Sequence, residues 1–228
     1  MDSRDLRPAR EFAQMYGCKS LVYGAPGSAK TPLIDTAPRP LLLACEAGLL
    51  SMRKSNVPTY QAFTPERIDE FFKWFFHSNE SKNFDTIAID SAPQMADIYL
   101  QNILNGKSKA GNKVHGQAAY GEMARNVMDN LRPLFYMPQK HAYVICKETS
   151  DAQGMKRPYF PGQQLNVDVP HLYDFILHLG IKNVPGMGQA LAFQCNQTFD
   201  ALARNRTGNL LDYEEPHFGK LVQKAMAT

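Results

Sequence analysis

Cysteine is scarce in this sequence, and its spacing excludes the commonest cysteine-based sites. The four cysteines lie far apart, and none of them forms a C-x-x-C pair or a Cys/His group. This spacing argues against a zinc site. Cys45, Cys146 and Cys195 lie within apolar runs, which predicts buried thiols in a reducing cytoplasm.

Long apolar runs are also missing. No segment approaches the roughly 18 apolar residues that a membrane-spanning helix requires. The first residues are charged and contain no apolar stretch of the kind found in a signal peptide. We expect a soluble protein in the cytoplasm, with no membrane partner.

A strong charge imbalance is absent as well. The 228 residues include 25 basic and 22 acidic side chains, for a net charge of +3. Such a balance gives no evidence for nucleic acid by itself, so that evidence must come from where the charges lie. The length suits one α/β domain, and no repeat or Pro/Gly/Ser-rich linker divides it. We therefore predict a single domain over residues 1–228.

Apolar runs alternate with helical patterns through most of the chain, which predicts an α/β fold whose sheet is mostly parallel. Thr64 begins a predicted helix, because threonine is a good N-cap and Pro65 fits the first helical position. The predicted strands are 20–24, 40–45, 85–90 and 141–147, and a second well-marked helix covers 123–134.

The last third of the chain has a different pattern. Residues 149–170 are rich in glycine and proline and predict a long loop. Three apolar segments then follow without an intervening helix, at 173–182, 190–196 and 199–206. Because only short turns join them, we expect these strands to pair antiparallel.

The first predicted strand leads into a phosphate-binding motif. It consists of Gly24, Ala25, Pro26, Gly27, Ser28, Ala29, Lys30 and Thr31. In such a loop the backbone N–H groups cradle phosphate oxygens, the lysine reaches the β- and γ-phosphates, and the threonine hydroxyl binds Mg²⁺. The motif therefore predicts binding of ATP with Mg²⁺.

One position departs from the motif, which has glycine where this chain has Ala29. Alanine is tolerated there if its φ is negative. Pro32 is unusual too, although proline in a first helical turn loses only an N–H that has no helical partner. The alternative is a Gly-Pro turn that merely resembles the motif.

Two carboxylates end predicted strands and are expected at the same edge of the sheet. Asp90 would hold Mg²⁺ through water, and the alternative is that it caps the following helix. Glu46 would orient and deprotonate an attacking water, and the alternative is an exposed strand-end glutamate.

Together these segments resemble the core-only RecA-like ATPases of bacteriophages, which act in single-strand annealing and recombination. The segments that carry the resemblance are GAPGSAKT, RPLLLACEAGL, DTIAIDS, HAYVICKE, PYFPGQ and ALARNRTG. The resemblance spans about residues 18–224 and implies a RecA-like P-loop NTPase core.

The resemblance also implies roles for individual residues. Glu46 falls at the position of the family's catalytic glutamate. Lys147 and Glu148 fall where a smaller polar residue usually senses the γ-phosphate. Arg204 and Arg206 fall where cations reach the γ-phosphate of a neighbouring subunit, and the alternative is that they only solvate a strand edge.

RecA-like proteins hold single-stranded DNA on two loops, which here correspond to about 149–170 and 183–189. The candidate DNA-binding residues are Lys156, Arg157, Tyr159, Phe160, Gly186 and Gly188. Basic side chains beside aromatic ones suit phosphate contact with base stacking. A second candidate surface contains Lys107, Lys109, Lys113 and His115, and the alternative there is a solvated loop.

The leading hypothesis is an ATPase that assembles as a homo-oligomer, ring or filament, on single-stranded DNA in the cytoplasm of an infected bacterium. A single-strand DNA-binding protein is a further expected partner. The first alternative is a nucleotide-dependent assembly or adaptor protein with little hydrolysis, which Ala29 favours. The second alternative is a P-loop kinase, against which the three C-terminal strands argue.

Overall fold

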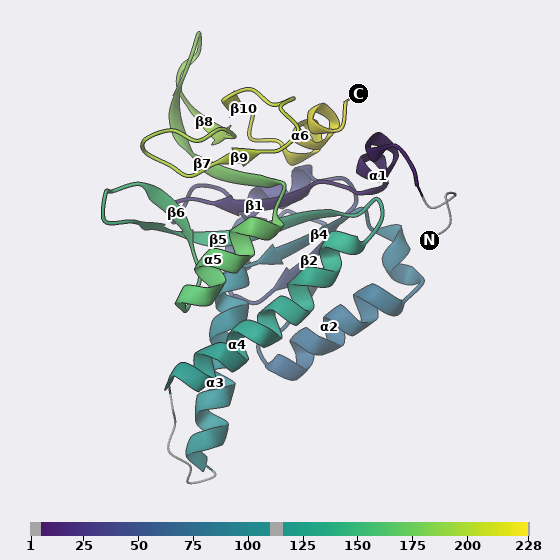
Figure 1. Ribbon diagram of the computed structural model, residues 1–228, viewed down its shortest axis with the longest axis vertical. Coiled ribbons are helices and arrows are strands. Elements are labelled where there is room, and N and C mark those ends of the chain that lie inside the picture. Colours follow the sequence, from purple (N-terminus) through teal and green to yellow (C-terminus); the bar gives the residue numbers. More distant parts are fainter. Residues whose placement is uncertain (1–5, 110–115, 228) are drawn as a thin grey trace.

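A twisted, mostly parallel sheet lies at the centre of the protein, seen in a computed structural model that describes residues 6–109 and 116–227 (Figure 1). The strand order is β10-β8-β7-β1-β5-β4-β2-β3, with β6 paired to β5 and β9 to β7. The strands are β1 (Lys19–Tyr23), β2 (Pro40–Ala44), β3 (Thr59–Gln61), β4 (Thr86–Asp90), β5 (His141–Ser150), β6 (Lys156–Tyr159), β7 (Phe175–Val184), β8 (Gly188–Gln194), β9 (Arg204–Asn205) and β10 (Tyr213–Glu214). Strands β3, β2, β4, β5, β1 and β7 run parallel, which confirms the predicted α/β fold.

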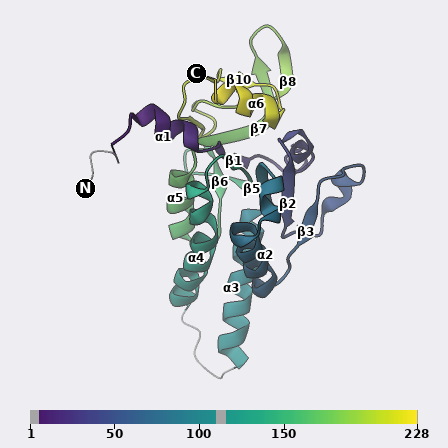
Figure 2. The same ribbon diagram turned by 90° about the vertical axis from the view of Figure 1, so that its right-hand side faces the viewer.

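Helices cover both faces of this sheet (Figure 2). Helices α2 to α5 lie against one face, while α6 and a short 3₁₀ helix, η2, lie against the other. The helices are α1 (Ala9–Met15), α2 (Pro65–His77), α3 (Ala92–Lys109), α4 (Gly116–Leu131), α5 (Gln163–Leu172) and α6 (Phe218–Ala225), with 3₁₀ helices η2 (Pro32–Thr36), η3 (Leu49–Met52), η4 (Glu80–Asn83) and η5 (Arg132–Tyr136).

Alternation along the central strands divides the core into two layers. In β5, Val144 packs toward α2 to α5, whereas Tyr143 and Ile145 pack toward α6 and η2. Successive side chains of a strand point to opposite faces, so a strand covered by helices on both sides must be apolar throughout. This explains why these strands form continuous apolar runs in the sequence.

Residues 149–170 are not the long loop that the sequence predicts. Strand β5 continues to Ser150, the chain returns as β6, and α5 follows. Asp151 closes the hairpin turn, because its Oδ1 accepts hydrogen bonds from the backbone N–H groups of Gln153 and Met155. Gly154, with a φ of +83°, lies in this turn between strands, which is a usual role for glycine. Pro158 lies in β6, Gly162 is the N-cap of α5 and Pro170 lies inside α5.

The C-terminal strands agree with the prediction in part. Strands β7 and β8 form the expected antiparallel hairpin, and β7 also pairs parallel with β1. The predicted third strand, 199–206, is reduced to the two residues of β9. In place of a longer strand, residues near Asp200 and Leu202 hydrogen-bond to the backbone of Lys156 in β6.

The structure bears on several other features of the sequence. All four cysteines are free and buried, as predicted for three of them. Thr64 caps α2, accepting a hydrogen bond from the Arg67 N–H at 3.5 Å. Across residues 6–109 and 116–227, the helices are too short or too polar to cross a bilayer. Of the second candidate DNA surface, Lys113 and His115 lie outside the described residues.

His141 links the start of β5 to the start of β1 and should make the protein sensitive to acid. Its Nδ1 accepts a hydrogen bond from the Cys18 N–H at 3.0 Å, which requires an unprotonated nitrogen. Burial first, and then nearby Lys19, lower the pKa of His141 below its ordinary value of 6.5. The unfolded chain therefore binds the proton more readily, so stability falls as pH drops below that value.

We expect wild-type protein to lose about 1 kcal/mol through this histidine between about pH 7 and pH 5. In His141→Asn, the amide oxygen can accept the same hydrogen bond without titrating. Urea unfolding at both pH values measures the difference. An equally steep pH dependence in the variant would contradict this role.

Candidate nucleotide site

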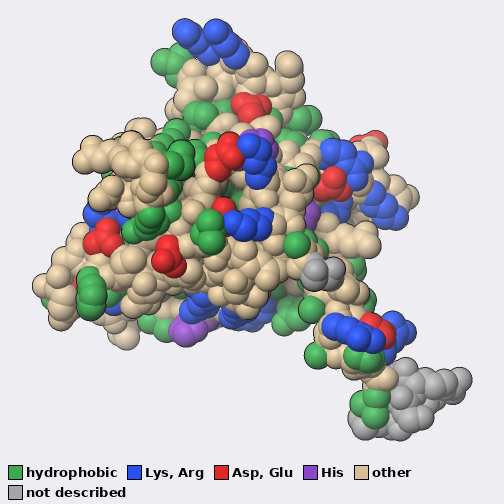
Figure 3. All heavy atoms as spheres, turned by 90° about the horizontal axis from the view of Figure 1, so that it is seen from above, with side chains coloured by type: hydrophobic (Ala, Val, Ile, Leu, Met, Phe, Trp, Pro, Cys, Tyr) green, Lys and Arg blue, Asp and Glu red, His purple; other side chains and the backbone are tan. Residues whose placement is uncertain are grey.

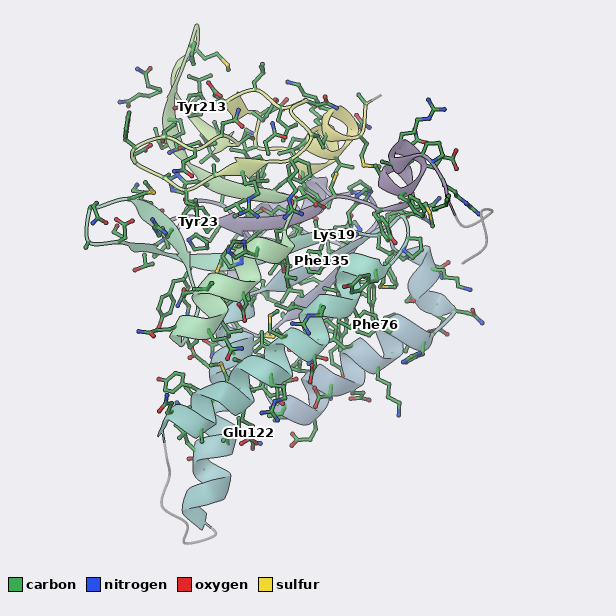
Figure 4. The ribbon with its side chains drawn as sticks, viewed as in Figure 1. Lys19, Tyr23, Phe76, Glu122, Phe135 and Tyr213 are labelled. Carbon is green, nitrogen blue, oxygen red and sulfur yellow. The ribbon has the colours of Figure 1, made fainter. Side chains whose placement is uncertain are left out.

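The phosphate loop follows β1 directly and turns tightly against β7. A Cβ atom on Gly24 would lie 2.2 Å from the Leu179 carbonyl oxygen, so only glycine fits. Gly27 has a φ of +79°, in the left-handed region that glycine tolerates best. Tyr23, labelled in Figure 4, is the last residue of β1 and anchors the strand that leads into this loop. The close approach to β7 and the positive φ explain why the motif has glycine at positions 24 and 27.

Ala29 adopts a backbone conformation that the sequence analysis did not allow for it. Its φ is +66°, so the negative angle under which alanine would be well tolerated is not found. A left-handed conformation costs a non-glycine residue about 1 kcal/mol. The loop thus has the backbone shape of a glycine-containing motif while carrying a methyl group.

Replacing this residue tests the strained conformation. Ala29→Gly is expected to raise the free energy of unfolding by about 0.5–1 kcal/mol, because glycine adopts a positive φ without strain. Ala29→Val is expected to lower it, since a β-branched residue is disfavoured there. Urea unfolding of both variants measures the order. A destabilised glycine variant would show that the loop does not hold this conformation.

Lys30 folds back over its own loop. Its Nζ donates hydrogen bonds to the Gly24 carbonyl oxygen at 2.7 Å, the Ala25 carbonyl oxygen at 2.9 Å and the Ser28 hydroxyl at 3.2 Å. Burial lowers the pKa of Lys30, while Asp90 and then Glu148 counteract that effect. The Lys30 amine is therefore bound to its own loop, and a polyphosphate would compete with these three oxygens for the amine.

Thr31 and Asp90 meet across the sheet edge. The Thr31 hydroxyl donates to Asp90 Oδ2 at 2.7 Å. Burial raises the pKa of the Asp90 carboxyl, and the hydrogen bond from Thr31 opposes that shift. A hydroxyl and a carboxylate are the oxygen ligands that Mg²⁺ takes together with phosphate and water, so the residues present fit the ion.

The capping alternative for Asp90 is not supported by the hydrogen bonds. The residue that caps α3 is Ser91, whose Oγ accepts from the Gln94 N–H at 3.4 Å and whose carbonyl accepts from the Met95 N–H at 3.0 Å. The Asp90 carboxylate is left to face Thr31.

Glu46 lies on the same edge and is held by Ser91. The Ser91 hydroxyl donates to Glu46 Oε1 at 2.5 Å. One cavity of about 390 Å³ is lined by Lys30, Glu46 and Asp90 together. The three side chains that the sequence analysis placed around a polyphosphate therefore share one pocket.

Lys147, which ends the predicted fourth strand, and Glu148, which follows it, have different surroundings. Lys147 Nζ lies 3.9 Å from Asp97 Oδ2, and both side chains are partly exposed. Glu148 lines the cavity and lies 2.8 Å from Nε2 of the buried His178. Sequence reasoning missed this histidine, because it lies in an apolar strand 30 positions away with no local pattern around it.

Arg204 and Arg206 contact α5 and the residues just after it. Arg204 Nη1 donates to the Pro170 carbonyl at 3.0 Å, and Arg206 Nη2 donates to the His171 carbonyl at 3.0 Å. Carbonyls in the last turn of a helix lack helical partners, and cations stabilise that end. Within one chain, these arginines therefore satisfy a helix terminus, which neither sequence alternative foresaw.

The predicted DNA-binding residues divide into buried and exposed groups. Phe160 is fully buried in the core beneath α5, so the prediction that it stacks on a base is wrong. Arg157 pairs with Asp151 at 2.8 Å within its own hairpin, and Tyr159 is 39% exposed. Gly186 and Gly188 have positive φ angles and form the turn of the β7–β8 hairpin.

Comparison with known proteins places the whole site inside a recognised domain. Residues 17–207 match a protein family described as an AAA domain. Among solved structures, the chain is similar to a KaiC-like protein from the hyperthermophilic archaea Pyrococcus horikoshii OT3, with 10% identity, a TM-score of 0.47 and coverage of 78% of this chain and 77% of that chain. No curated protein matches it. The family match includes every site residue from Gly24 to Arg206.

Proposed function

This chain belongs to the AAA domain family of P-loop ATPases, and from that premise we propose that the phosphate loop and the neighbouring strand ends bind and hydrolyse ATP with Mg²⁺. The observation that carries the proposal is the shared cavity that Lys30, Glu46 and Asp90 line. Family membership implies a nucleotide and typically Mg²⁺, and the shared cavity supports a role for each of these side chains.

Each side chain has a distinct proposed role. Lys30 releases its loop carbonyls and binds the β- and γ-phosphates. The Thr31 hydroxyl and the Asp90 carboxylate hold the metal ion, which neutralises phosphate charge when bound. Glu46, fixed by the Ser91 hydroxyl, accepts a proton from the attacking water.

For the biological role of this ATPase activity, we propose that the protein is a RecA-like recombination ATPase. It assembles on single-stranded DNA and promotes annealing or strand exchange. Support comes from two hairpins that extend from the sheet edge carrying the phosphate loop, β5–β6 to the left and β7–β8 toward the top of Figure 1. The first presents Lys156, Arg157 and Tyr159, and Met187 at the tip of the second is 75% exposed.

Surface charge limits where DNA could lie. On the face shown in Figure 3, basic side chains form several separate groups with acidic side chains between them. On this face, DNA binding would therefore depend on the hairpins and not on one broad basic surface.

Fluorescence anisotropy with a labelled single-stranded oligonucleotide tests the DNA role. We expect binding at low salt that is tighter with ATP than with ADP, and that weakens as salt rises. Arg157→Ala and Tyr159→Ala should weaken it, whereas Arg132→Ala should not, because Arg132 is exposed in η5 at the opposite edge of the sheet. A protein that hydrolyses ATP without binding DNA at any salt would overturn the recombination role.

Assembly through trans arginines remains part of the proposal. Arg204 and Arg206 would have to leave the end of α5 to reach a neighbouring subunit. Mixing Arg206→Ala with Lys30→Ala protein provides the test. Recovered ATPase activity would support an active site shared between subunits. No recovery at any ratio would rule out the proposed trans role of Arg206.

A second candidate function is a nucleotide-dependent assembly protein with little turnover. The methyl group of Ala29 and the engagement of Lys30 by its own loop favour it, because both oppose close contact between the loop and the phosphates. Tight binding of a fluorescent ATP analogue with negligible hydrolysis, with or without DNA, would establish this reading.

A further inference from the structure

The phosphate pocket contains more negative charge than its proposed function uses. Its ionisable lining consists of the cations Lys30 and Lys147 and the carboxylates Glu46, Asp90 and Glu148, together with Cys146. In the proposed function, Asp90 holds the metal ion and Glu46 activates water. Glu148 has no part in either step, and its negative charge would lie beside the phosphates of a bound nucleotide.

Glu148 is held firmly in this position. Its Oε2 lies 2.8 Å from His178 Nε2, and only 16% of its side chain is exposed. The ring of His178 is buried and packs against Tyr23 in a tilted arrangement, with a centroid distance of 4.9 Å. Tyr23 is fixed in turn by hydrogen bonds to the carbonyls of Lys156 and Leu202. The carboxylate therefore cannot leave the pocket without disturbing a packed histidine.

Lys30 of the phosphate loop offsets part of the Glu148 charge, and the neighbours of Glu148 outside that loop add little to this. Burial, and then Lys182, lower the pKa of His178, so the ring is neutral at neutral pH and donates a hydrogen bond without adding a positive charge. Lys156 Nζ is 3.9 Å away and substantially exposed. Lys182, the other cation near the ring, is itself paired with Asp200 at 3.3 Å. Tyr23, the remaining titratable group against the ring, is uncharged.

We propose that Glu148 makes nucleotide binding depend on a divalent metal, because its carboxylate opposes a metal-free polyphosphate in the pocket much more than a metal-bound one. This inference rests on the proposed function of the site. A metal-bound triphosphate carries two fewer negative charges, so the repulsion from Glu148 is correspondingly smaller.

The test compares binding of a fluorescent ATP analogue in Mg²⁺ and in EDTA. Glu148→Gln keeps an oxygen that can accept the His178 hydrogen bond and removes the charge. We expect it to tighten metal-free binding by about tenfold or more, and Mg²⁺-dependent binding by only about twofold. Glu215→Gln is the matched control, since it removes the charge of an exposed carboxylate whose partner is Lys220, outside the pocket.

A structural role for Glu148 gives a different result. Loss of a supporting hydrogen bond would weaken binding in both conditions, and that outcome, or an equal gain in both, overturns the inference. If wild-type protein binds no nucleotide even with Mg²⁺, the proposed function itself fails. If it binds normally and Glu148→Gln changes nothing, only this inference fails.

The pH profile provides an independent readout. Below the titration of His178, an imidazolium would offset the Glu148 charge, so metal-free binding by wild-type protein should tighten as pH falls. His178→Gln retains a donor toward Glu148 and cannot become charged. Its pH profile should be flatter than that of the wild type, after the shared titration of the nucleotide is subtracted. Identical profiles would count against the proposed charge effect.

Discussion

Glu46→Gln is expected to lower ATP turnover by about 10²–10⁴-fold while leaving nucleotide binding within about twofold of wild type. The amide cannot accept a proton from water, which removes the proposed base. It can still accept the hydrogen bond from Ser91, because Oε1 is retained, so the strand end should keep its shape. Steady-state ATPase rates and the affinity for a fluorescent nucleotide give the two numbers.

The outcome separates catalysis from binding. Glu70→Gln is a suitable control, because this glutamate lies on α2 and pairs with the Tyr60 hydroxyl, outside the cavity. Equal loss of binding and turnover in Glu46→Gln would mean that this carboxylate holds the nucleotide or the metal ion and does not activate water.

Lys30→Ala is expected to weaken Mg²⁺-ATP binding by about a hundredfold or more, since it removes the only charge of the loop that reaches the phosphates. The fold should survive, because the Lys30 amine hydrogen-bonds to oxygens of its own loop, and the Lys30 carbonyl that accepts from the Tyr143 hydroxyl is retained in alanine. The thermal shift caused by Mg²⁺-ATP measures the loss, and it should vanish in the variant.

The exposed lysine at position 54 provides the control for this experiment, as it lies in the segment after η3. Lys54→Ala should keep a wild-type thermal shift. A Lys30→Ala protein that still shows the full shift would place the nucleotide somewhere other than the phosphate loop, and the proposed function would fail.

Much of the fold could be predicted because its signals are local. The apolar runs of β1, β2, β4 and β5 and the cap at Thr64 each depend on neighbouring residues. The phosphate loop is similarly contained within eight residues. The carboxylates could be placed beside it because parallel strands end at the same edge of a sheet.

The errors arose where distant contacts decide the structure. Strand β6 has four residues and gains hydrogen bonds from the segment near Asp200, which no local pattern indicates. Phe160 looks like a stacking residue beside a basic pair, yet it is fully buried in the core, and its backbone hydrogen-bonds to Asn166 of α5. The Glu148–His178 contact joins two strands that are separated by β6 and α5 in the chain.

The four buried cysteines have a practical consequence for experiments on this protein. Burial raises the pKa of Cys18, Cys45 and Cys195 to about 12, and raises that of Cys146 as well. Maleimides and similar reagents attack the thiolate, so the native thiols should stay unlabelled while the protein is folded. Met187→Cys would then carry a single fluorophore at the tip of the β7–β8 hairpin, and its fluorescence would report binding of a partner at that tip.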